Sequence, residues 1–364
     1  MSPWADTHAD AAQELLIRLV RTPSPSGGEA AAAGLLAEWA NARGLQPEVD
    51  DAAVRLVLDS GRPGPTLLFV SHLDTVPAGE GWSLSPHEGR VERGRLTGRG
   101  AVDAKASVSA MAAAVAHTRA TGGPARGRLV MLATYAEETR DTSMPEALRR
   151  LGAPPDAAIV GEPTSLEPCV AQRGQLLLRL VWEGEQVHAG WAAGRRPAPV
   201  NAIREAVRDL AALEALEFPR LHDRLGAVAL TPTMLSAGVA RNMTPPSCEA
   251  VLDIRTTPCY SHAELVGLVR SRVKGRVEIH SDRLVPAETP EDSRLLAAVL
   301  KARPSARSFA SPTCSDWVFL RHVDALKLGP GDSRQSHTAD EWIELAEVTA
   351  GARLYADVAR GLLS

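Results

Sequence analysis

Histidines and carboxylates follow several apolar segments of this sequence, in a pattern that suits a divalent metal ion. His72 and Asp74 come directly after the apolar run 66–70, and the alternation of a strand would place both on the same side. Five more such residues follow later in the chain: Asp103, Glu137, Glu138, Glu162 and His337. Two imidazoles with several carboxylates form a donor set typical of zinc and similar divalent ions.

These donors are more numerous than one catalytic ion requires. A single catalytic zinc takes three protein ligands, whereas two ions that share a carboxylate take five, in a type of site used for hydrolysis. Glu137 and Glu138 are adjacent, so one can bind a metal while the other reaches the attacking water as general base. The pattern therefore favours hydrolysis at a pair of metal ions.

Each of these residues also has an ordinary structural interpretation. Asp103 at the start of a helix could be an N-cap, and Glu137 with Glu138 could belong to a solvated charged face. His337, which precedes Thr-Ala-Asp-Glu, could belong to a capping motif at a helix entry. The pair at the first strand end could be part of a plain turn. Their joint appearance at successive strand ends favours the metal site.

Strands and helices alternate in the part of the chain that carries most of these residues. We expect strands near 54–58, 66–70, 128–135 and 157–160, and helices near 104–120 and 143–151. Ser26 is a candidate N-cap for a further helix that ends near Ala42. The alternation is typical of an α/β protein, in which functional sites lie at the carboxyl ends of the strands.

Residues 175–284 follow a different pattern. The expected strands and helices occur there in the order β-α-β-β-α-β of a ferredoxin-like sandwich. Its first helix carries an amphipathic pattern of large apolar residues: Val200, Ile203, Val207 and Leu210. We therefore expect a first domain formed by residues 1–174 and 285–364, with residues 175–284 inserted as a second domain.

The composition is that of an ordinary globular protein. The 364 residues suffice for two domains, and 23% charged with 45% hydrophobic residues are usual values. A net charge of −4 and 4% aromatic residues argue against nucleic acid as the main partner. The four cysteines form no C-x-x-C pair, and neither a signal peptide nor a long apolar run is evident. We expect a cytoplasmic protein with reduced thiols and no membrane association.

Five segments resemble the metal-site motifs of the M20 clan of metallo-hydrolases, which includes acetylornithine deacetylases, succinyl-diaminopimelate desuccinylases and glutamate carboxypeptidases. They occur in the order of the family's motifs: Ser71–Pro77, Gly98–Lys105, Ala136–Thr139, Gly161–Thr164 and His337–Glu341. The resemblance covers nearly the whole chain. It implies a mixed-sheet, zinc-peptidase-like catalytic domain, an inserted ferredoxin-like domain that acts as lid and dimerisation domain, and a homodimer.

The resemblance also implies two divalent metal ions, zinc in the first place, with cobalt or manganese also suited. His72, Asp103 and Glu162 would hold one ion, and Asp103, Glu138 and His337 would hold the other. Asp103 would bridge the two. At positions 104 and 106, relatives usually have Met and Gly, whereas this chain has alanines, which should preserve the helix that begins there.

Further residues receive roles by the same resemblance. Asp74 would orient the first metal-binding histidine, and Glu137 would be the general base that later protonates the leaving amine. His188 resembles a histidine that relatives lend across a dimer to the tetrahedral oxyanion. Asn242 and Arg255 match positions that hold a substrate carboxylate.

The segments Gly98–Lys105 and Gly329–Ser333 most resemble one branch of the clan. Its members release lysine or ornithine from the C-terminal glutamate of an acidic amino-group carrier protein, in lysine or arginine biosynthesis. A basic surface for the carrier is then expected, and Arg195, Arg196 and Arg241 are candidates. The alternatives are a deacetylase of free N-acetyl-ornithine or N-acetyl-lysine, and a non-catalytic metal-binding relative.

Overall fold

The computed structural model describes residues 6–139 and 143–364, and the chain divides into two compact units. Unit 1 consists of Met1–Val170, Glu288–Phe309 and Ser315–Ser364, and unit 2 of Ala171–Ala287 and Ala310–Cys314. The sequence predicted residues 175–284 as the inserted domain, and this range does not include the short segment Ala310–Cys314 of unit 2. Within the described residues, no helix is long and apolar enough to cross a membrane.

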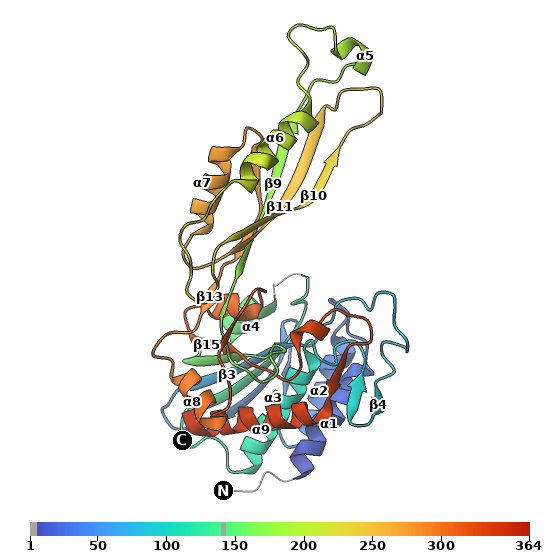
Figure 1. Ribbon diagram of the computed structural model, residues 1–364. Helices are drawn as coiled ribbons and strands as arrows, with labels where there is room; N and C mark the ends of the chain where they lie inside the picture. The colour runs from blue at the N-terminus through green and yellow to red at the C-terminus, as the bar shows by residue number, and fades with distance from the viewer. Residues whose placement is uncertain (1–5, 140–142) are drawn as a thin grey trace. The chain divides into compact units, whose positions relative to one another are not determined.

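A mixed sheet forms the centre of unit 1, with the strand order β1-β2-β6-β3-β7-β15-β8-β13 and with β14 paired to β8 (Figure 1). The pairs β3–β6, β3–β7 and β7–β15 are parallel, whereas β1–β2, β2–β6 and β8–β15 are antiparallel. The strand bounds are β1 Glu48–Val49, β2 Ala53–Asp59, β3 Thr66–His72, β6 Arg128–Thr134, β7 Ala157–Val160, β8 Cys169–Gln172, β13 Ala287–Glu288, β14 Phe309–Ser311 and β15 Asp324–Lys327. Every residue of β3 is buried, as the apolar run predicted.

Helices α1, α3 and α9 pack against one another on this sheet. The helices of unit 1 are α1 Asp6–Val20, α2 Ala30–Asn41, α3 Lys105–Ala120, α4 Ser143–Arg150, α8 Arg294–Ala302 and α9 Leu345–Leu362, with the 3₁₀ helices η1 Asp316–Leu320 and η2 Ser333–Gln335. The first thirteen residues of α3 are all buried, because its alanines allow close packing on both sides. The predicted N-cap at Ser26 is wrong: Glu29 is the residue before α2, and the Ser26 hydroxyl instead donates to the Asp74 carboxylate at 2.7 Å.

A small antiparallel sheet in unit 1 has the order β16-β5-β4, formed by β4 Arg90–Glu92, β5 Arg95–Thr97 and β16 Trp342–Glu344. The segment that begins at His337 therefore leads into strand β16, and α9 starts only at Leu345. The helix-entry interpretation of His337 is wrong for this reason.

Unit 2 contains an antiparallel sheet of order β10-β11-β9-β12, with α6 and α7 packed on it (Figure 1). Its elements are β9 Gly174–Glu183, α5 Ala189–Ala192, α6 Ala202–Glu214, β10 Ala229–Ala237, β11 Ser247–Thr256, α7 His262–Arg272 and β12 Arg276–Leu284. Apart from the short helix α5, this is the predicted β-α-β-β-α-β order. Alternate residues of β9 and β11 point into the core.

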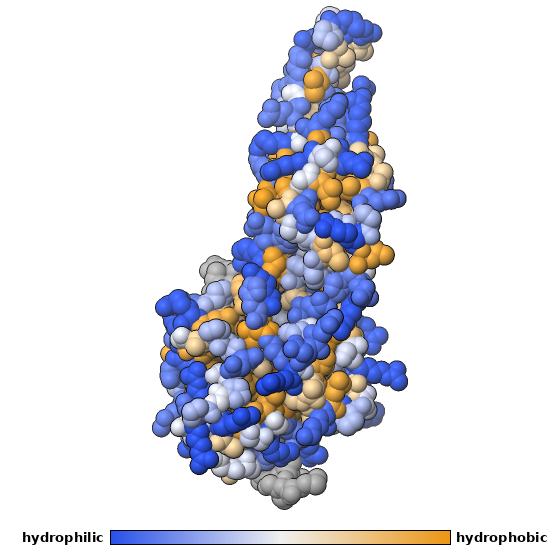
Figure 2. Space-filling model, turned by 90° about the vertical axis from the view of Figure 1, so that its left-hand side faces the viewer, coloured by the Kyte–Doolittle hydropathy of each residue, from blue (hydrophilic) through white to orange (hydrophobic). Residues whose placement is uncertain are grey.

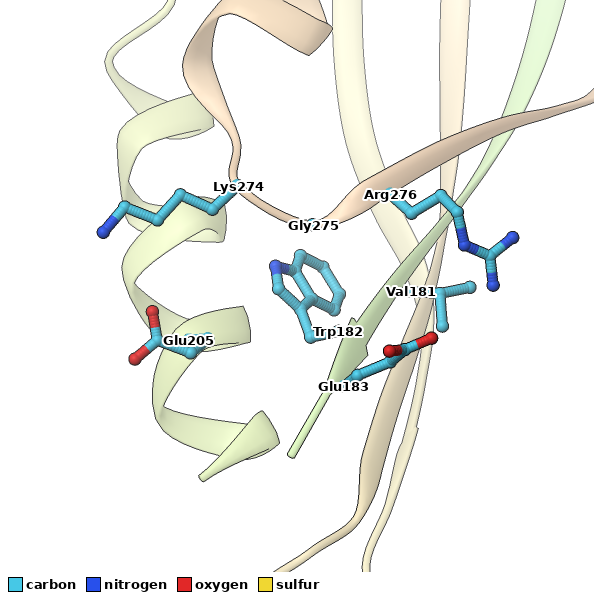
Figure 3. A pocket seen from close by; sticks show the side chains of 7 residues that line it. All are labelled: Val181, Trp182, Glu183, Glu205, Lys274, Gly275 and Arg276. Carbon is cyan, nitrogen blue, oxygen red and sulfur yellow. The ribbon is translucent and has the colours of Figure 1, made fainter. Parts of the chain in front are cut away.

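The turn between α7 and β12 is fixed by a buried tryptophan and a buried carboxylate. Asp209 Oδ2 accepts hydrogen bonds from Trp182 Nε1 at 2.6 Å and from the backbone N–H groups of Lys274 and Gly275 at 2.7 and 2.9 Å. Figure 3 shows the indole of Trp182 directly beneath Gly275. A Cβ at position 275 would lie 2.5 Å from Trp182 Nε1, so the close approach requires glycine.

The large apolar residues of the α6 pattern divide between solvent and the core. Ile203 and Val207 of α6, and Val200 just before it, are 41%, 58% and 51% exposed. Leu210 packs against the core of unit 2, where Ala202 and Ala206 are also buried. Figure 2 shows apolar side chains among hydrophilic ones on the surface of unit 2.

Candidate metal centre

Three parallel strands bring candidate residues to one edge of the main sheet in unit 1. His72 is the last residue of β3, which runs parallel to both β6 and β7. Glu137 and Glu138 follow β6, and Glu162 follows β7. Because the carboxyl ends of parallel strands meet at the same edge, these side chains come from neighbouring positions.

Asp103 lies between the two candidate histidines. One of its carboxylate oxygens, Oδ1, is 3.3 Å from His72 Nε2, and the other, Oδ2, is 3.5 Å from His337 Nε2. His337 Nε2 is also 3.0 Å from Glu138 Oε1. Potential ligand atoms of His72, Asp103 and Glu138 all lie within 4.8 Å of one another. Asp103 is not the N-cap of α3, since Ala104 holds that position, and its carboxylate faces the histidines instead.

Asp74 is fully buried behind this cluster. Its carboxylate accepts hydrogen bonds from the backbone N–H groups of Glu137 and Glu138, both at 3.1 Å, and from the Ser26 hydroxyl. Nδ1 of His72 is 3.0 Å from the Asp74 carbonyl oxygen and 3.3 Å from its carboxylate. These contacts leave Nε2 of His72 as the nitrogen that faces Asp103.

Carboxylates are crowded at this edge, and their pKa values reflect it. Burial raises the pKa of Glu162 to about 8, with a further contribution from Asp103. Burial also raises the pKa of Glu137 well above its usual range, against the opposing charge of His72. Burial would raise the pKa of Asp103 too, but its hydrogen bond with His72 and the charges of both histidines outweigh that effect and lower it. The site concentrates negative charge that a cation would neutralise.

The donor set therefore fits divalent metal ions. Imidazole nitrogens and carboxylate oxygens are the ligands that zinc and related ions prefer, and the two oxygens of Asp103 point to different histidines, as a bridging carboxylate requires. The anchoring of His72 by Asp74 is the arrangement that usually supports a metal-binding histidine.

Several supporting residues were not foreseen from the sequence. Glu341 is fully buried and accepts hydrogen bonds from the loop that carries Asp103. Lys105 is fully buried, and its Nζ donates to the carbonyl oxygens of Leu19 and Thr22, both at 2.9 Å. Asp316 is 4% exposed, and its charge contributes to the raised pKa of Glu137. The only sequence signal for the first two was their place inside family-like motifs.

The remaining candidates belong to unit 2. His188 is exposed and is the N-cap of α5, where its Nδ1 accepts a hydrogen bond from Gly190 N at 3.1 Å. Asn242 is exposed at the neighbouring loop, and its backbone carbonyl accepts from Ala189 N at 2.8 Å. Arg255 is half-buried at the end of β11 and forms an ion pair with Asp253 at 2.8 Å.

Residues 68–361 match the model of peptidase family M20/M25/M40, and the chain belongs to this family. It is therefore a metal-dependent amidohydrolase. Among solved structures it is similar to aminopeptidase PepT from Bacillus cereus, with a TM-score of 0.82 at 18% identity over 98% of this chain and 99% of that one. It is also similar to the YXEP protein of Bacillus subtilis, a dinuclear metal binding peptidase of the M20 family, with a TM-score of 0.71 at 14% identity over 99% of both chains.

Three of its sequence relatives carry different activity names. A Pyrobaculum aerophilum protein provisionally named LysW-lysine/LysW-ornithine hydrolase is 31% identical over 93% of this chain and 94% of its own. The succinyl-diaminopimelate desuccinylase of Halorhodospira halophila is 30% identical over 97% of both chains. The acetylornithine deacetylase of Proteus mirabilis is 29% identical over 92% of both. All three names denote hydrolysis of an amide bond.

Proposed function

We propose that this protein is an isopeptide hydrolase that releases lysine or ornithine from the C-terminal glutamate of an acidic amino-group carrier protein. The hydrolytic part rests on one observation: Glu137 lies beside a cluster in which Asp103 faces two histidines. The carrier-linked substrate is supported by the similarity to the Pyrobaculum aerophilum protein over 93% of this chain.

Two divalent ions, zinc in the first place, would be held by His72, Asp103 and Glu162 on one side and by Asp103, Glu138 and His337 on the other. Such ions supply a Lewis acid that polarises the scissile carbonyl and lowers the pKa of a water molecule. Asp74 would hold these ligands in position. Its carboxylate contacts His72 and accepts hydrogen bonds from the backbone N–H groups of Glu137 and Glu138.

Glu137 would move the proton in this reaction. Burial raises its pKa well above the usual range, so its carboxylate is a stronger base than an ordinary glutamate. Such a group can accept a proton from the attacking water and return it to the leaving amine. Changing Glu137 to Gln keeps the shape but removes the base, so turnover should fall by at least about 100-fold while bound metal stays at the wild-type level. Glu138→Gln is the matched control, since it should lower the metal content. Unchanged turnover in Glu137→Gln contradicts the mechanism.

A second candidate is deacylation of a free small molecule. The acetylornithine deacetylase and the succinyl-diaminopimelate desuccinylase among the relatives are almost as similar as the carrier-related protein, at 29% and 30% identity. A direct comparison of kcat/KM on carrier-linked lysine, carrier-linked ornithine, N-acetyl-ornithine and N-succinyl-diaminopimelate decides between them. Faster turnover of either free compound rejects the carrier-linked substrate and leaves the hydrolase class intact.

We further propose a homodimer formed through unit 2. Support comes from the exposed apolar face of α6 and from β10, which is an edge strand with Met234 and Leu235 exposed by 67% and 58%. Edge strands and apolar helix faces are left uncovered in few monomers. Sedimentation of wild type against Val207→Asp tests this, because a charge on the outer face of α6 should shift the protein toward monomer. A monomeric wild type contradicts it.

In this dimer His188 would serve the active site of the other subunit, with Asn242 and Arg255 holding the substrate carboxylate. Mixing the inactive variants His188→Ala and Glu137→Gln tests the exchange. Random reassociation of a twofold dimer should restore about a quarter of wild-type activity, since mixed dimers contain one intact site. No recovery after verified exchange of subunits rejects a role across the dimer.

The carrier would dock on the outer loops of unit 2. Hydrogen bonds join residues 184–200 to residues 238–244. The two segments carry Arg195, Arg196 and Arg241, and the first also carries Trp191, which is 76% exposed. Arg195 pairs with Glu185, whereas the side chain of Arg196 donates to the backbone carbonyls of Ala193 and Arg195. Replacing Arg196 and Arg241 with Ser should raise KM for the carrier-linked substrate and weaken its salt dependence, with kcat unchanged. An unchanged KM rejects this surface.

A further inference from the structure

A single buried carboxylate holds the loop that carries Asp103. Glu341 is fully buried, and its Oε1 accepts hydrogen bonds from Val102 N at 2.7 Å and from Asp103 N at 3.1 Å. Its Oε2 accepts from Gly100 N at 3.0 Å and from Arg99 Nη1 at 2.7 Å. Four donors from five consecutive residues therefore converge on one side chain.

The same residue belongs to the segment that carries the second histidine. Glu341 is four positions after His337, and its backbone carbonyl accepts from Gly98 N at 2.9 Å. The neighbouring Asp340 accepts from Ser83 N at 2.9 Å. Both the side chain and the backbone of Glu341 thus hold the segment 337–341 against the loop 98–103. Each of the two segments carries one candidate metal ligand, His337 and Asp103.

The surroundings permit little adjustment of this contact. Arg99 is 2% exposed, and its other terminal nitrogen, Nη2, donates to the Ala78 carbonyl at 3.0 Å. Gly100 has φ of +80°, and a Cβ there would lie 2.8 Å from Thr75 and 3.0 Å from Lys105. The turn can close around the carboxylate only with glycine at this position. A buried carboxylate with four donors, one of them cationic, is fully satisfied and rigid.

We propose that Glu341 is a positioning residue that fixes Asp103 between His72 and His337 before any metal is bound. The inference rests on the proposed metal site and deepens it, because it assigns the preorganisation of the shared carboxylate to a residue outside the ligand set. Without the Glu341 carboxylate, the N–H groups of residues 100, 102 and 103 lose their common acceptor. The loop can then turn Asp103 away from one histidine.

The test measures zinc binding directly. The variant Glu341→Gln keeps the size of the side chain but replaces one acceptor oxygen with an N–H₂ group, which opposes two of the four donors in either orientation of the amide. Equilibrium dialysis of the metal-free protein against buffered zinc gives the affinity and the number of ions bound. We expect a loss of affinity of about 10- to 100-fold, the usual effect of removing a residue that orients a ligand.

Asp209→Asn is the matched control. Asp209 is also a buried carboxylate that accepts backbone N–H groups, but it lies in unit 2. Both variants should lower the melting temperature, and only Glu341→Gln should lower zinc affinity. Wild-type zinc affinity in folded Glu341→Gln overturns the inference and leaves a structural role only. A wild-type protein that binds no divalent ion overturns the proposed function itself, which is a distinguishable result.

A second variant covers the case in which Glu341→Gln does not fold. Arg99→Lys keeps a cation near Glu341 but cannot make both the contact with Glu341 and the contact with Ala78 through a planar guanidinium. A drop in zinc affinity in this variant supports the inference, and an unchanged affinity overturns it.

Discussion

Changing Asp74 to Asn should weaken the site without removing any proposed metal ligand. The carboxylate accepts hydrogen bonds from Ser26 Oγ and from the N–H groups of Glu137 and Glu138, and it contacts His72. An asparagine amide has only one acceptor oxygen, so at least one of these donors loses its partner. His72 also loses the negative charge that orients its ring.

The size of the effect follows from the pKa of Asp74. Burial would raise this pKa, but the hydrogen bond with His72, the charge of His72 and the bonds from Ser26 and Glu138 outweigh it and lower the pKa from 3.8 to about 2. A shift of that size corresponds to about 2–3 kcal/mol of folding free energy in the metal-free protein. A melting temperature about 3–6 °C below wild type follows for a protein of this size. Zinc affinity and kcat/KM should each fall by about 10- to 100-fold.

The pH dependence has a definite sign. Because the folded-state pKa is depressed, the contribution of Asp74 is complete above pH ~4 and is lost as the pH falls toward ~2, with about half of it gone by pH 3. Chemical denaturation of metal-free wild type and Asp74→Asn at pH 6 and pH 3 measures this. The difference in unfolding free energy between the two proteins should be smaller at pH 3.

Ser26→Ala is the control for this prediction. It removes one hydrogen bond to Asp74 but keeps the charge, so it should cost about 1 kcal/mol and leave zinc affinity within a few-fold of wild type. If Asp74→Asn binds zinc as tightly as Ser26→Ala does, Asp74 does not orient His72 and the reasoning is refuted.

Three further predictions concern the same unit. Removal of metal by a chelator should lower the melting temperature, because ions that bind only the folded state stabilise it, and added zinc should restore it; a melting temperature indifferent to the chelator contradicts the site. Gly161→Ala should cost about 1–3 kcal/mol, measured by denaturant unfolding, since its Cβ would lie 2.8 Å from side-chain atoms of both Met111 and Ser107; wild-type stability would show that these neighbours can shift. Lys105→Met should cost about 1–3 kcal/mol in the same assay because it removes the side-chain donor shared by the carbonyl oxygens of Leu19 and Thr22, and a neutral effect would mean that water replaces the ammonium group.

The strand ends that carry the candidate residues could be predicted because they depend on local sequence. Apolar runs bounded by turn residues mark buried strands, and the polar residues after 66–70 and 157–160 stand out against them. Parallel pairing then brings those ends together without any knowledge of side-chain contacts.

Contacts between distant segments could not be predicted in the same way. Ser26 fits an N-cap by its local sequence, and only the folded chain brings it to Asp74. Glu341 fits a charged helix entry, and its role appears only when the loop before α3 closes around it. The amphipathic pattern predicted the helix α6 but not which of its apolar residues are exposed, because periodicity does not distinguish a face toward the core from a face toward solvent.

The order in which the site can form during synthesis follows from where its donors lie in the sequence. His72 and Glu162 precede unit 2, whereas β15, His337 and Glu341 follow it. At about 5–20 residues per second, His337 leaves the ribosome roughly 15–50 s after His72. During that interval the nascent chain contains His72 and Asp103 but not His337, so one carboxylate oxygen of Asp103 lacks the histidine that it faces in the folded protein. The proposed second set of metal ligands is therefore complete only late in synthesis. A chain interrupted before residue 337 would keep His72, Asp103 and Glu138 but would lack His337 and the contact of Glu341 with the loop that carries Asp103.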